Sequence, residues 1–244
     1  MTIRKANFAL GLLASVLTLP LAARAQVTDL SRDPKNNFNN GYSLPAADSR
    51  EIKGTPFLLS YWSPAMMQLA AGGAPISANL KYDVYRQELR VKRPQGDSVV
   101  VPLNKVKDFS LTGSGATRRF VCYPAAALPP EAGGGCAEVL ADGSHAQLLK
   151  FVRKEVVKQA GESSSYASAS TVSMLETQTS YYLRWATDGH FTPLRLKRAS
   201  LEQALTGQPA ALAALKTRKG NLSSEADLAA AVTTIDPLLT GTSR

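Results

Sequence analysis

Alternation of apolar and polar side chains with a period of two dominates the chain from about residue 56 to residue 196. It is clearest in residues 76–85, where Leu80, Tyr82 and Val84 occupy alternate positions and polar residues stand between them. Branched and aromatic residues in this arrangement are typical of a half-buried strand, because successive side chains of a strand point to opposite faces. The pattern therefore predicts a strand with these three side chains on its inner face.

Shorter apolar runs between turn-forming residues predict the remaining strands. We expect them near residues 66–70, 89–91, 98–101, 106–111, 119–123, 137–140, 146–152, 171–179, 181–186 and 191–196. Two Asp-Gly pairs, Asp142-Gly143 and Asp188-Gly189, separate runs of this kind. Because glycine adopts the positive φ angles of a tight turn, each pair predicts a hairpin. The run after Asp142-Gly143 also fits a helix by its spacing, but the preceding turn favours a strand.

From about residue 198 the spacing of apolar residues becomes helical. Leu201 and Leu205 predict a first short helix, and Pro209 suits the first turn of a second. Ser224 followed by Asp227 resembles a capping box and opens a third helix. Short helices gain their stability from docking, so we expect this tail to cover an edge or face of the sheet. A tail that recognises another protein is the alternative.

These patterns predict an α+β, mostly β protein. We expect an antiparallel sheet or half-open barrel of about eight to ten strands, followed by three short C-terminal helices. The expected parts are a signal peptide in residues 1–25, a flexible segment in 26–54, a β-rich domain in 55–196 and a helical tail packed on the sheet in 197–237. The flexible segment can act as a tether, or dock onto the folded body through Phe38 and Tyr42.

The first 25 residues have the composition of an export signal. Arg4 and Lys5 precede an apolar stretch, and Ala23-Arg24-Ala25 presents the small-x-small pattern that signal peptidase recognises. The apolar stretch is shorter than the roughly 20 residues needed to cross a bilayer, and no second long apolar run follows. We therefore expect cleavage before Gln26, no transmembrane segment in the mature chain, and a periplasmic or secreted location.

The charge of the chain narrows the choice of partner. The 244 residues carry a net charge of +9, and removing the signal peptide with its three basic and no acidic residues lowers this to +6. A basic surface on an exported protein suits an acidic glycan or another envelope component, although the excess can also serve solubility alone. Export and the lack of a continuous basic stripe argue against nucleic acid. The expected partners are an envelope protein or an acidic glycan.

The chain has two cysteines, Cys122 and Cys136, on either side of a segment rich in alanine, proline and glycine. An oxidising compartment permits their pairing, and we expect a disulfide that closes this loop. A metal or redox pair is the competing interpretation. It lacks the C-x-x-C spacing and neighbouring histidines that such sites use.

Catalytic motifs are few. His145 and His190 each stand beside an Asp-Gly turn, so two imidazoles and two carboxylates could meet if both turns lay at one end of a sheet. Turn chemistry explains these residues without a ligand. The chain has no G-x-S-x-G nucleophile elbow and no phosphate-binding loop. We therefore expect no metal, no cofactor and no catalytic residue, with a small periplasmic hydrolase or a lipophilic-ligand carrier as the alternative to a binding protein.

Aromatic residues give candidate contact surfaces, because Tyr61-Trp62 and Tyr181-Tyr182 with Trp185 could each stack on a sugar ring or a peptide. Alternation places Tyr181, Leu183 and Trp185 on one face of a strand, and Tyr182 with Arg184 on the other. Core packing explains the first face. We expect the second, Tyr182 and Arg184, to be the face that contacts a ligand.

Two motifs carry a resemblance to a known group. Lys53-Gly54-Thr55-Pro56-Phe57-Leu58 is similar to the lys-gly-ser/thr-pro-tyr/phe-leu start of a group of exported, uncharacterised Bacteroidota proteins. Leu80-Lys81-Tyr82-Asp83-Val84-Tyr85, followed by Glu88-Leu89, resembles that group's leu-arg/lys-tyr-asn/asp-x-tyr-x-x-glu-leu signature. A leu-x-asp-gly hairpin, a tyr-tyr-leu strand and a helical tail recur in the same order, so the resemblance covers about residues 53–236.

The resemblance implies export and a β-rich core with a helical tail, and it transfers no catalytic residue. The chain departs from the group in its Ala/Pro-rich loops and its cysteine pair. From all these features we expect an exported, non-enzymatic cell-envelope or secreted protein that binds a protein or a glycan.

Overall fold

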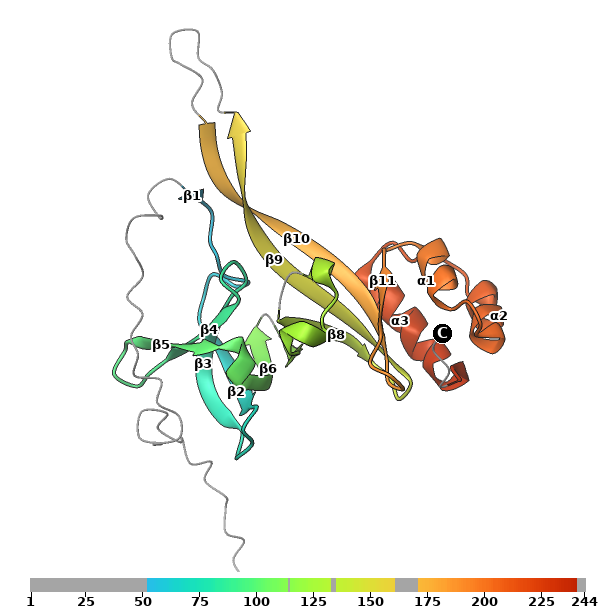
Figure 1. Ribbon diagram of the computed structural model, residues 1–244, viewed down its shortest axis with the longest axis horizontal. Helices are drawn as coiled ribbons and strands as arrows, with labels where there is room; N and C mark the ends of the chain where they lie inside the picture. Colours follow the sequence, from blue (N-terminus) through green and yellow to red (C-terminus); the bar gives the residue numbers. More distant parts are fainter. Residues whose placement is uncertain (1–51, 114, 133–134, 161–170, 241–244) are drawn as a thin grey trace, which may run out of the picture.

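The computed structural model describes residues 52–113, 115–132, 135–160 and 171–240. Within them, one open sheet of eleven strands is followed by a small group of helices (Figure 1). The strands are β1 (Ile52–Lys53), β2 (Ser63–Leu69), β3 (Ile76–Asp83), β4 (Glu88–Lys92), β5 (Ser98–Pro102), β6 (Val106–Gly113), β7 (Ala116–Cys122), β8 (Cys136–Asp142), β9 (Ala146–Ala160), β10 (Thr171–Trp185) and β11 (Phe191–Leu194). The α-helices are α1 (Arg198–Ala204), α2 (Pro209–Thr217) and α3 (Glu225–Ile235), and the short 3-10 turns are η1 (Leu103–Lys105), η2 (Ala125–Ala127), η3 (Pro130–Ala132) and η4 (Asp236–Leu238).

The sheet is mixed, which corrects the expectation of a purely antiparallel one. Its strand order is β1-β10-β9-β8-β7-β6-β2-β3-β4-β5, with β11 also paired to β10. Every pair that the described residues form is antiparallel except β1 with β10, where Ile52 lies opposite Ser173. We had placed Ile52–Lys53 in the flexible segment, and their pairing also takes the number of strands above the eight to ten expected.

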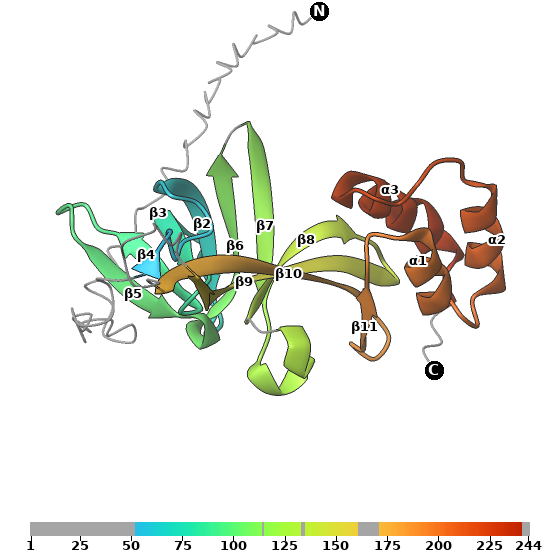
Figure 2. The same ribbon diagram turned by 90° about the horizontal axis from the view of Figure 1, so that it is seen from above.

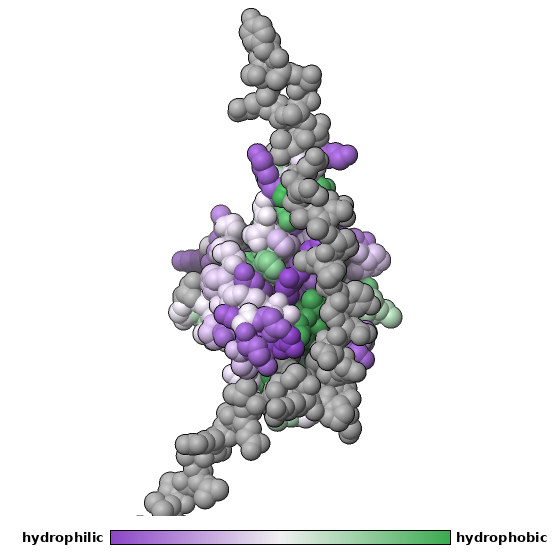
Figure 3. Space-filling model, turned by 90° about the vertical axis from the view of Figure 1, so that its left-hand side faces the viewer, coloured by the Kyte–Doolittle hydropathy of each residue, from purple (hydrophilic) through white to green (hydrophobic). Residues whose placement is uncertain are grey.

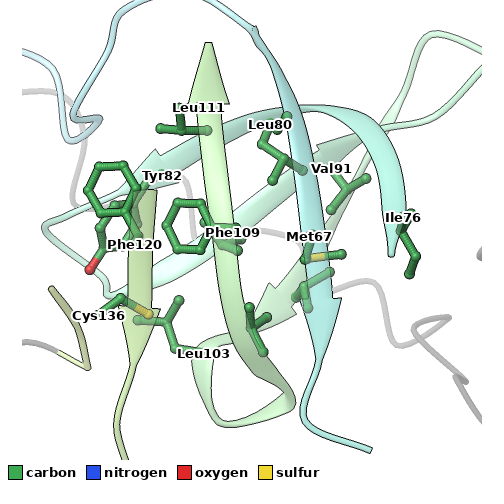
Figure 4. Close-up of a cluster of buried hydrophobic side chains, with 14 of the residues drawn as sticks. Met67, Ile76, Leu80, Tyr82, Val91, Leu103, Phe109, Leu111, Phe120 and Cys136 are labelled. Atoms are coloured by element: carbon green, nitrogen blue, oxygen red, sulfur yellow. The ribbon is translucent and has the colours of Figure 1, made fainter. Parts of the chain in front are cut away.

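Apolar side chains fill the inner face of the half built by β2–β7 (Figure 4). Leu80, Tyr82 and Val84 are each at most 1 % exposed, which confirms the inner face predicted from their alternation. The rings of Phe109 and Phe120 are stacked with centroids 4.8 Å apart, and Tyr82 meets Phe109 edge-on. Aromatic pairs of this kind contribute about 0.5–1.5 kcal/mol beyond the burial of their area. The interior of this half is therefore a packed core.

A long hairpin of β9 and β10 joins the two halves of the molecule. The two strands have fifteen residues each; the outer end of β9 extends beyond β8, and the outer end of β10 pairs with β1 (Figure 1). The prediction of two strands, 171–179 and 181–186, was wrong, because Ser180 lies within one uninterrupted ladder opposite Phe151. Near the middle of β9, the Lys154 N–H donates to the Val84 carbonyl at 3.1 Å, so the curled sheet comes back on itself without closing.

The three expected helices are present and lie at the end of the sheet opposite β2–β5 (Figure 2). They cover β8, β9 and β11 with a second apolar cluster, in which Leu201, Leu228 and Val232 are fully buried. Ser224 is the N-cap of α3, where the sequence predicts that this helix opens, since the Asp227 N–H donates to the Ser224 hydroxyl at 3.1 Å. The Asp227 carboxylate contacts the same hydroxyl at 2.6 Å. The helices thus gain their stability from docking, as their short length requires.

The expected disulfide joins Cys122 and Cys136, which stand directly opposite each other on β7 and β8. Its loop carries η2 and η3. Two residues of this loop, Tyr123 and Leu128, pack against a third apolar cluster on the sheet.

The two Asp-Gly turns need glycine for different reasons. Gly189 has a positive φ of 72°, as a tight turn predicts. Gly143 has no positive φ, and glycine is required there because a Cβ would collide with the carboxylate of Asp236. The Asp142-Gly143 turn is therefore shaped by contact with the helical tail.

Candidate functional site

The outer face of β3 and β4 brings two cations side by side. Lys81 and Arg90 are directly opposite each other across the two strands. Their side chains point outward because the neighbouring Leu80 and Leu89 face the core. Like charges in this position destabilise a strand pair, so the arrangement costs the fold some stability.

Aromatic rings hold these two cations in place. The Lys81 ammonium lies 4.9 Å from the ring centre of Phe57 and 5.4 Å from that of Trp62, and the Arg90 guanidinium lies 5.6 Å from that of Phe57. Each contact of this kind contributes about 0.5–1 kcal/mol at an exposed site. Lys92 stands two residues from Arg90 on the same face and is exposed. We call this surface, made of Phe57, Trp62, Lys81, Arg90 and Lys92, the cationic face.

Phe57 reaches the cationic face because its segment runs along the end of β3. The Leu58 N–H donates to the Tyr82 carbonyl at 2.8 Å, and the Val84 N–H donates to the Pro56 carbonyl at 3.0 Å. The Lys154 ammonium also donates to the Phe57 carbonyl at 2.9 Å. The position of the ring is thus set by backbone hydrogen bonds on both sides.

The charge of the cationic face is only partly neutralised. Arg90 has an ion pair with Glu88 at 3.6 Å, whereas Lys81 has no acidic partner in the described part of the chain. Burial, followed by the nearby Asp83 carboxylate, raises the pKa of Glu88 above its ordinary value. Figure 3 views this end of the molecule and shows hydrophilic side chains gathered around smaller apolar patches. Within the described residues, Lys81 and Lys92 are therefore the two cations of this face without an acidic partner.

A groove of about 640 Å³ adjoins the cationic face, between β4, β5, η1 and the disulfide loop. Its size is in the range of sites that hold small ligands or peptide side chains. Val100 lies opposite Arg90 and Pro102 opposite Glu88, so the groove continues the outer surface of these strands. We call it the proline groove; its apolar lining includes Val100, Pro102, Leu103, Tyr123, Pro124 and Leu128.

Gln87 connects the two walls of the proline groove. It is the one non-glycine residue with a positive φ, 57°, in the described ranges. Its Oε1 accepts a hydrogen bond from the Tyr82 hydroxyl at 2.8 Å and another from the Gly135 N–H at 3.3 Å. A left-handed backbone is strained for a residue with a side chain, and it is held here by these contacts. The β3–β4 turn and the disulfide loop are thereby fixed relative to each other.

Tyr182 and Arg184, the contact face predicted from sequence, lie elsewhere. Tyr182 is 3 % exposed and packs edge-on against Phe151 in the cluster beneath the disulfide loop. The Arg184 guanidinium lies over the ring of Tyr123, 5.5 Å from its centre. The two residues do share a face, as alternation predicted. The loop between the cysteines folds over that face and leaves Tyr182 little exposed surface, so a ligand contact at Tyr182 and Arg184 stays a prediction.

The two histidine turns do come together. The Ala186 N–H donates to the His145 carbonyl at 2.8 Å, which joins the two hairpins. The side chains have other contacts: His145 Nδ1 lies 3.0 Å from the Ser144 hydroxyl, and the Asp142 carboxylate pairs with Arg119. Among the described residues, no group of three or more His, Cys, Asp or Glu side chains is arranged to hold a metal ion.

A second polar cluster joins α3 to the sheet, and sequence analysis did not find it. Arg118 donates two hydrogen bonds of 2.7 Å to Glu138, and the Lys150 ammonium lies 2.6 Å from Glu225. The Tyr181 hydroxyl donates to Glu225 at 2.8 Å. Burial alone would raise the pKa of Glu225, but Lys150 and Tyr181 hold it below its ordinary value. Both carboxylates face cations, so the cluster acts as a structural link between elements far apart in the sequence.

The fold and the site together define an open mixed sheet with a cationic face beside an apolar groove. No family model, curated protein sequence or solved structure matches the chain. In the part of the chain that the structure describes, none of the helices is long and apolar enough to span a membrane.

Proposed function

We propose that this protein is an exported, non-enzymatic binding protein of the cell envelope or the extracellular space, and that its cationic face binds an acidic partner. The observation that carries the proposal is the position of Lys81, directly opposite Arg90 and without an acidic partner in the described residues. A strand pair that keeps two cations side by side gains stability when an anion binds between them.

Charge pairing elsewhere in the molecule supports this interpretation. Arg118 pairs with Glu138 and Lys150 with Glu225, so these two partly buried cations have carboxylates beside them. Lys81 is also partly buried but is held only by aromatic rings. The net charge of +6 expected for the chain without its first 25 residues further favours association with polyanions.

The disulfide supports export, because disulfides persist in oxidising compartments and are rare in the cytosol. The signal-like first 25 residues and the resemblance to exported Bacteroidota proteins favour the same location. We expect intact-mass and N-terminal analysis of protein recovered from cells to show a chain that begins at Gln26 with Cys122 and Cys136 oxidised. Protein that retains Met1 and has reduced cysteines would contradict export.

Reversing the charge of Lys81 tests the cationic face. We expect Lys81→Glu to weaken binding of fluorescently labelled polyglutamate about tenfold, equivalent to about 1.4 kcal/mol, because the new carboxylate pairs with Arg90 and repels the ligand. Fluorescence anisotropy at low and moderate salt measures the effect, and the difference between variant and wild type should shrink as salt rises.

The matched control is Lys219→Glu, which makes the same charge change in the exposed loop between α2 and α3. Its effect on polyglutamate binding should be less than about twofold, because the site lies at the other end of the molecule, well beyond a Debye length of about 8 Å. Equal losses in both variants would mean that net charge alone attracts the polymer, and the cationic face would then not be the site.

A further inference from the structure

One edge of the sheet lies free beside the cationic face. The strand order ends at β5, and in the described residues no strand pairs with its outer side. Its sequence, Ser98-Val99-Val100-Val101-Pro102, is apolar and rich in β-branched residues. The exposed backbone groups of an edge strand are a template for pairing with another chain.

The pairing of β4 with β5 shows which backbone groups are free. The Arg93 N–H donates to the Asp97 carbonyl at 2.9 Å, which marks a hydrogen-bonded pair at the hairpin end. Hydrogen-bonded and non-bonded pairs alternate along an antiparallel ladder, so Val99 and Val101 bond to β4. The N–H and C=O groups of Val100 therefore point to the free edge.

An added strand at this edge would lie on the outer side of β5, beside the proline groove and one strand away from β4. Val100 is directly opposite Arg90, and its side chain lines the proline groove. Alternate side chains of an incoming strand would face the same surface. Acidic side chains there would lie two strand spacings, about 10 Å, from the strand that carries Arg90 and Lys92. The long side chains of Arg90 and Lys92 would reach toward them across Val100. Apolar side chains of the incoming strand would enter the groove beside Leu103 and Leu128.

We propose that β5 binds an extended acidic segment of a partner protein as an additional antiparallel or parallel strand. This inference rests on the proposed function and names its partner. A peptide fits better than an acidic glycan because it supplies N–H and C=O groups for the free edge and apolar side chains for the groove. Charge complementarity with Lys81, Arg90 and Lys92 selects an acidic sequence.

The substitution Val100→Pro tests the added strand directly. Proline removes the outward N–H, and it is tolerated on an edge strand where that N–H faces solvent, so the β4–β5 ladder is kept. The probe is a fluorescein-labelled nonapeptide in which every second residue, the set that faces the cationic face and the proline groove, is Glu, Asp, Val or Leu, and the residues between them are Thr. We expect its affinity, measured by anisotropy, to fall at least about tenfold in Val100→Pro. In the matched control Val100→Ala, which keeps the N–H, it should fall less than about threefold.

A second measurement leaves the protein unchanged. The N–H groups of a strand point alternately to its two sides, so two peptides are made, each N-methylated on one of these two sets of amides. The peptide methylated on the set that faces β5 cannot donate hydrogen bonds to β5, and its affinity should be at least about tenfold lower than that of the parent peptide. Equal affinity of both methylated peptides and the parent peptide would overturn strand addition even if Val100→Pro fails to fold.

The failure of each proposal has its own signature. If Lys81→Glu weakens binding of both polyglutamate and the nonapeptide while Val100→Pro and Val100→Ala behave alike, the cationic face stands and strand addition is overturned. If Lys81→Glu changes neither, the proposed function fails. In a third outcome, the wild-type protein forms a dimer that Val100→Pro abolishes, while it does not bind the nonapeptide. That result would assign the β5 edge to a second copy of the chain and would overturn the proposal that a partner protein's segment binds there.

Discussion

Replacing Asp236 with asparagine should lower the free energy of unfolding by about 3 kcal/mol, because a buried charged acceptor is lost from four hydrogen bonds. Its Oδ1 accepts from the N–H groups of His145 and Ala146 at 3.0 and 2.8 Å. Its Oδ2 accepts from the N–H and the hydroxyl of Ser144 at 2.8 and 3.0 Å. An asparagine side chain turns one acceptor into a donor that faces these donors. Unfolding in urea at pH 7 measures the change.

The effect should depend on pH in a defined direction. Burial alone would raise the pKa of Asp236, but the N–H groups of Ala146, His145 and Ser144 hold it below its ordinary value. A carboxyl group whose pKa is lowered by folding contributes stability above its unfolded pKa of about 3.9, and this contribution is lost as the pH falls through the folded pKa. The difference between wild type and Asp236→Asn should therefore be largest near pH 7 and smaller near pH 3.

The control for Asp236→Asn is Asp97→Asn, whose exposed carboxylate pairs with Arg93 in the β4–β5 turn. It should change the unfolding midpoint little, because exposed ion pairs contribute little to stability. A loss of less than about 1 kcal/mol in Asp236→Asn at pH 7, or the same loss at pH 3, would show that this carboxylate does not hold the helical tail to the β8–β9 turn.

Removing the disulfide should have an effect of similar size. Cys122 and Cys136 are 14 residues apart, and closing a loop of about 15 residues stabilises a fold by roughly 3 kcal/mol in the chain-entropy model. We expect the double variant Cys122→Ala/Cys136→Ala to lose about 3 kcal/mol in urea unfolding, and wild type under reducing conditions to lose a similar amount.

The Cys122→Ala/Cys136→Ala variant should also lose the fixed shape of the proline groove. The loop that it closes contributes Tyr123, Pro124 and Leu128 to the lining, and Gly135 binds Gln87 on the opposite wall. A looser loop should therefore weaken binding of the acidic nonapeptide more than binding of polyglutamate, which needs only the cationic face. An unchanged unfolding midpoint, or equal losses for the two ligands, would contradict this role of the loop.

Features that depend on neighbouring residues could be predicted from the sequence. The inner face of β3 follows from a period of two, and the start of α3 follows from Ser224 and Asp227, three residues apart. The disulfide follows from two cysteines around a flexible loop. In each case the physical cause acts over a short stretch of chain, so the pattern is visible without the fold.

Features that depend on distant segments could not be predicted in this way. The pairing of β1 with β10 joins residues more than a hundred positions apart, and Asp236 binds Ser144 across 92 positions. Burial of Tyr182 depends on the path of the disulfide loop, which strand alternation does not contain.

The arrangement of Lys81 opposite Arg90 could be predicted in part. The sequence predicts strands in residues 76–85 and 89–91, and a short turn between them places either Arg90 or Lys92 opposite Lys81. The cation opposite Lys81 was therefore within reach of the sequence. Its contact with Phe57 was not, because that ring comes from a separate segment along the end of β3.

Mapping the binding site by amide chemical shifts tests the central claim most directly. Titration of the ¹⁵N-labelled protein with polyglutamate should shift the amides of residues 57, 62, 81, 90 and 92 and leave those of α1–α3 unchanged. Shifts confined to the helices or to the outer ends of β9 and β10, or no shifts at all, would contradict a site on the cationic face.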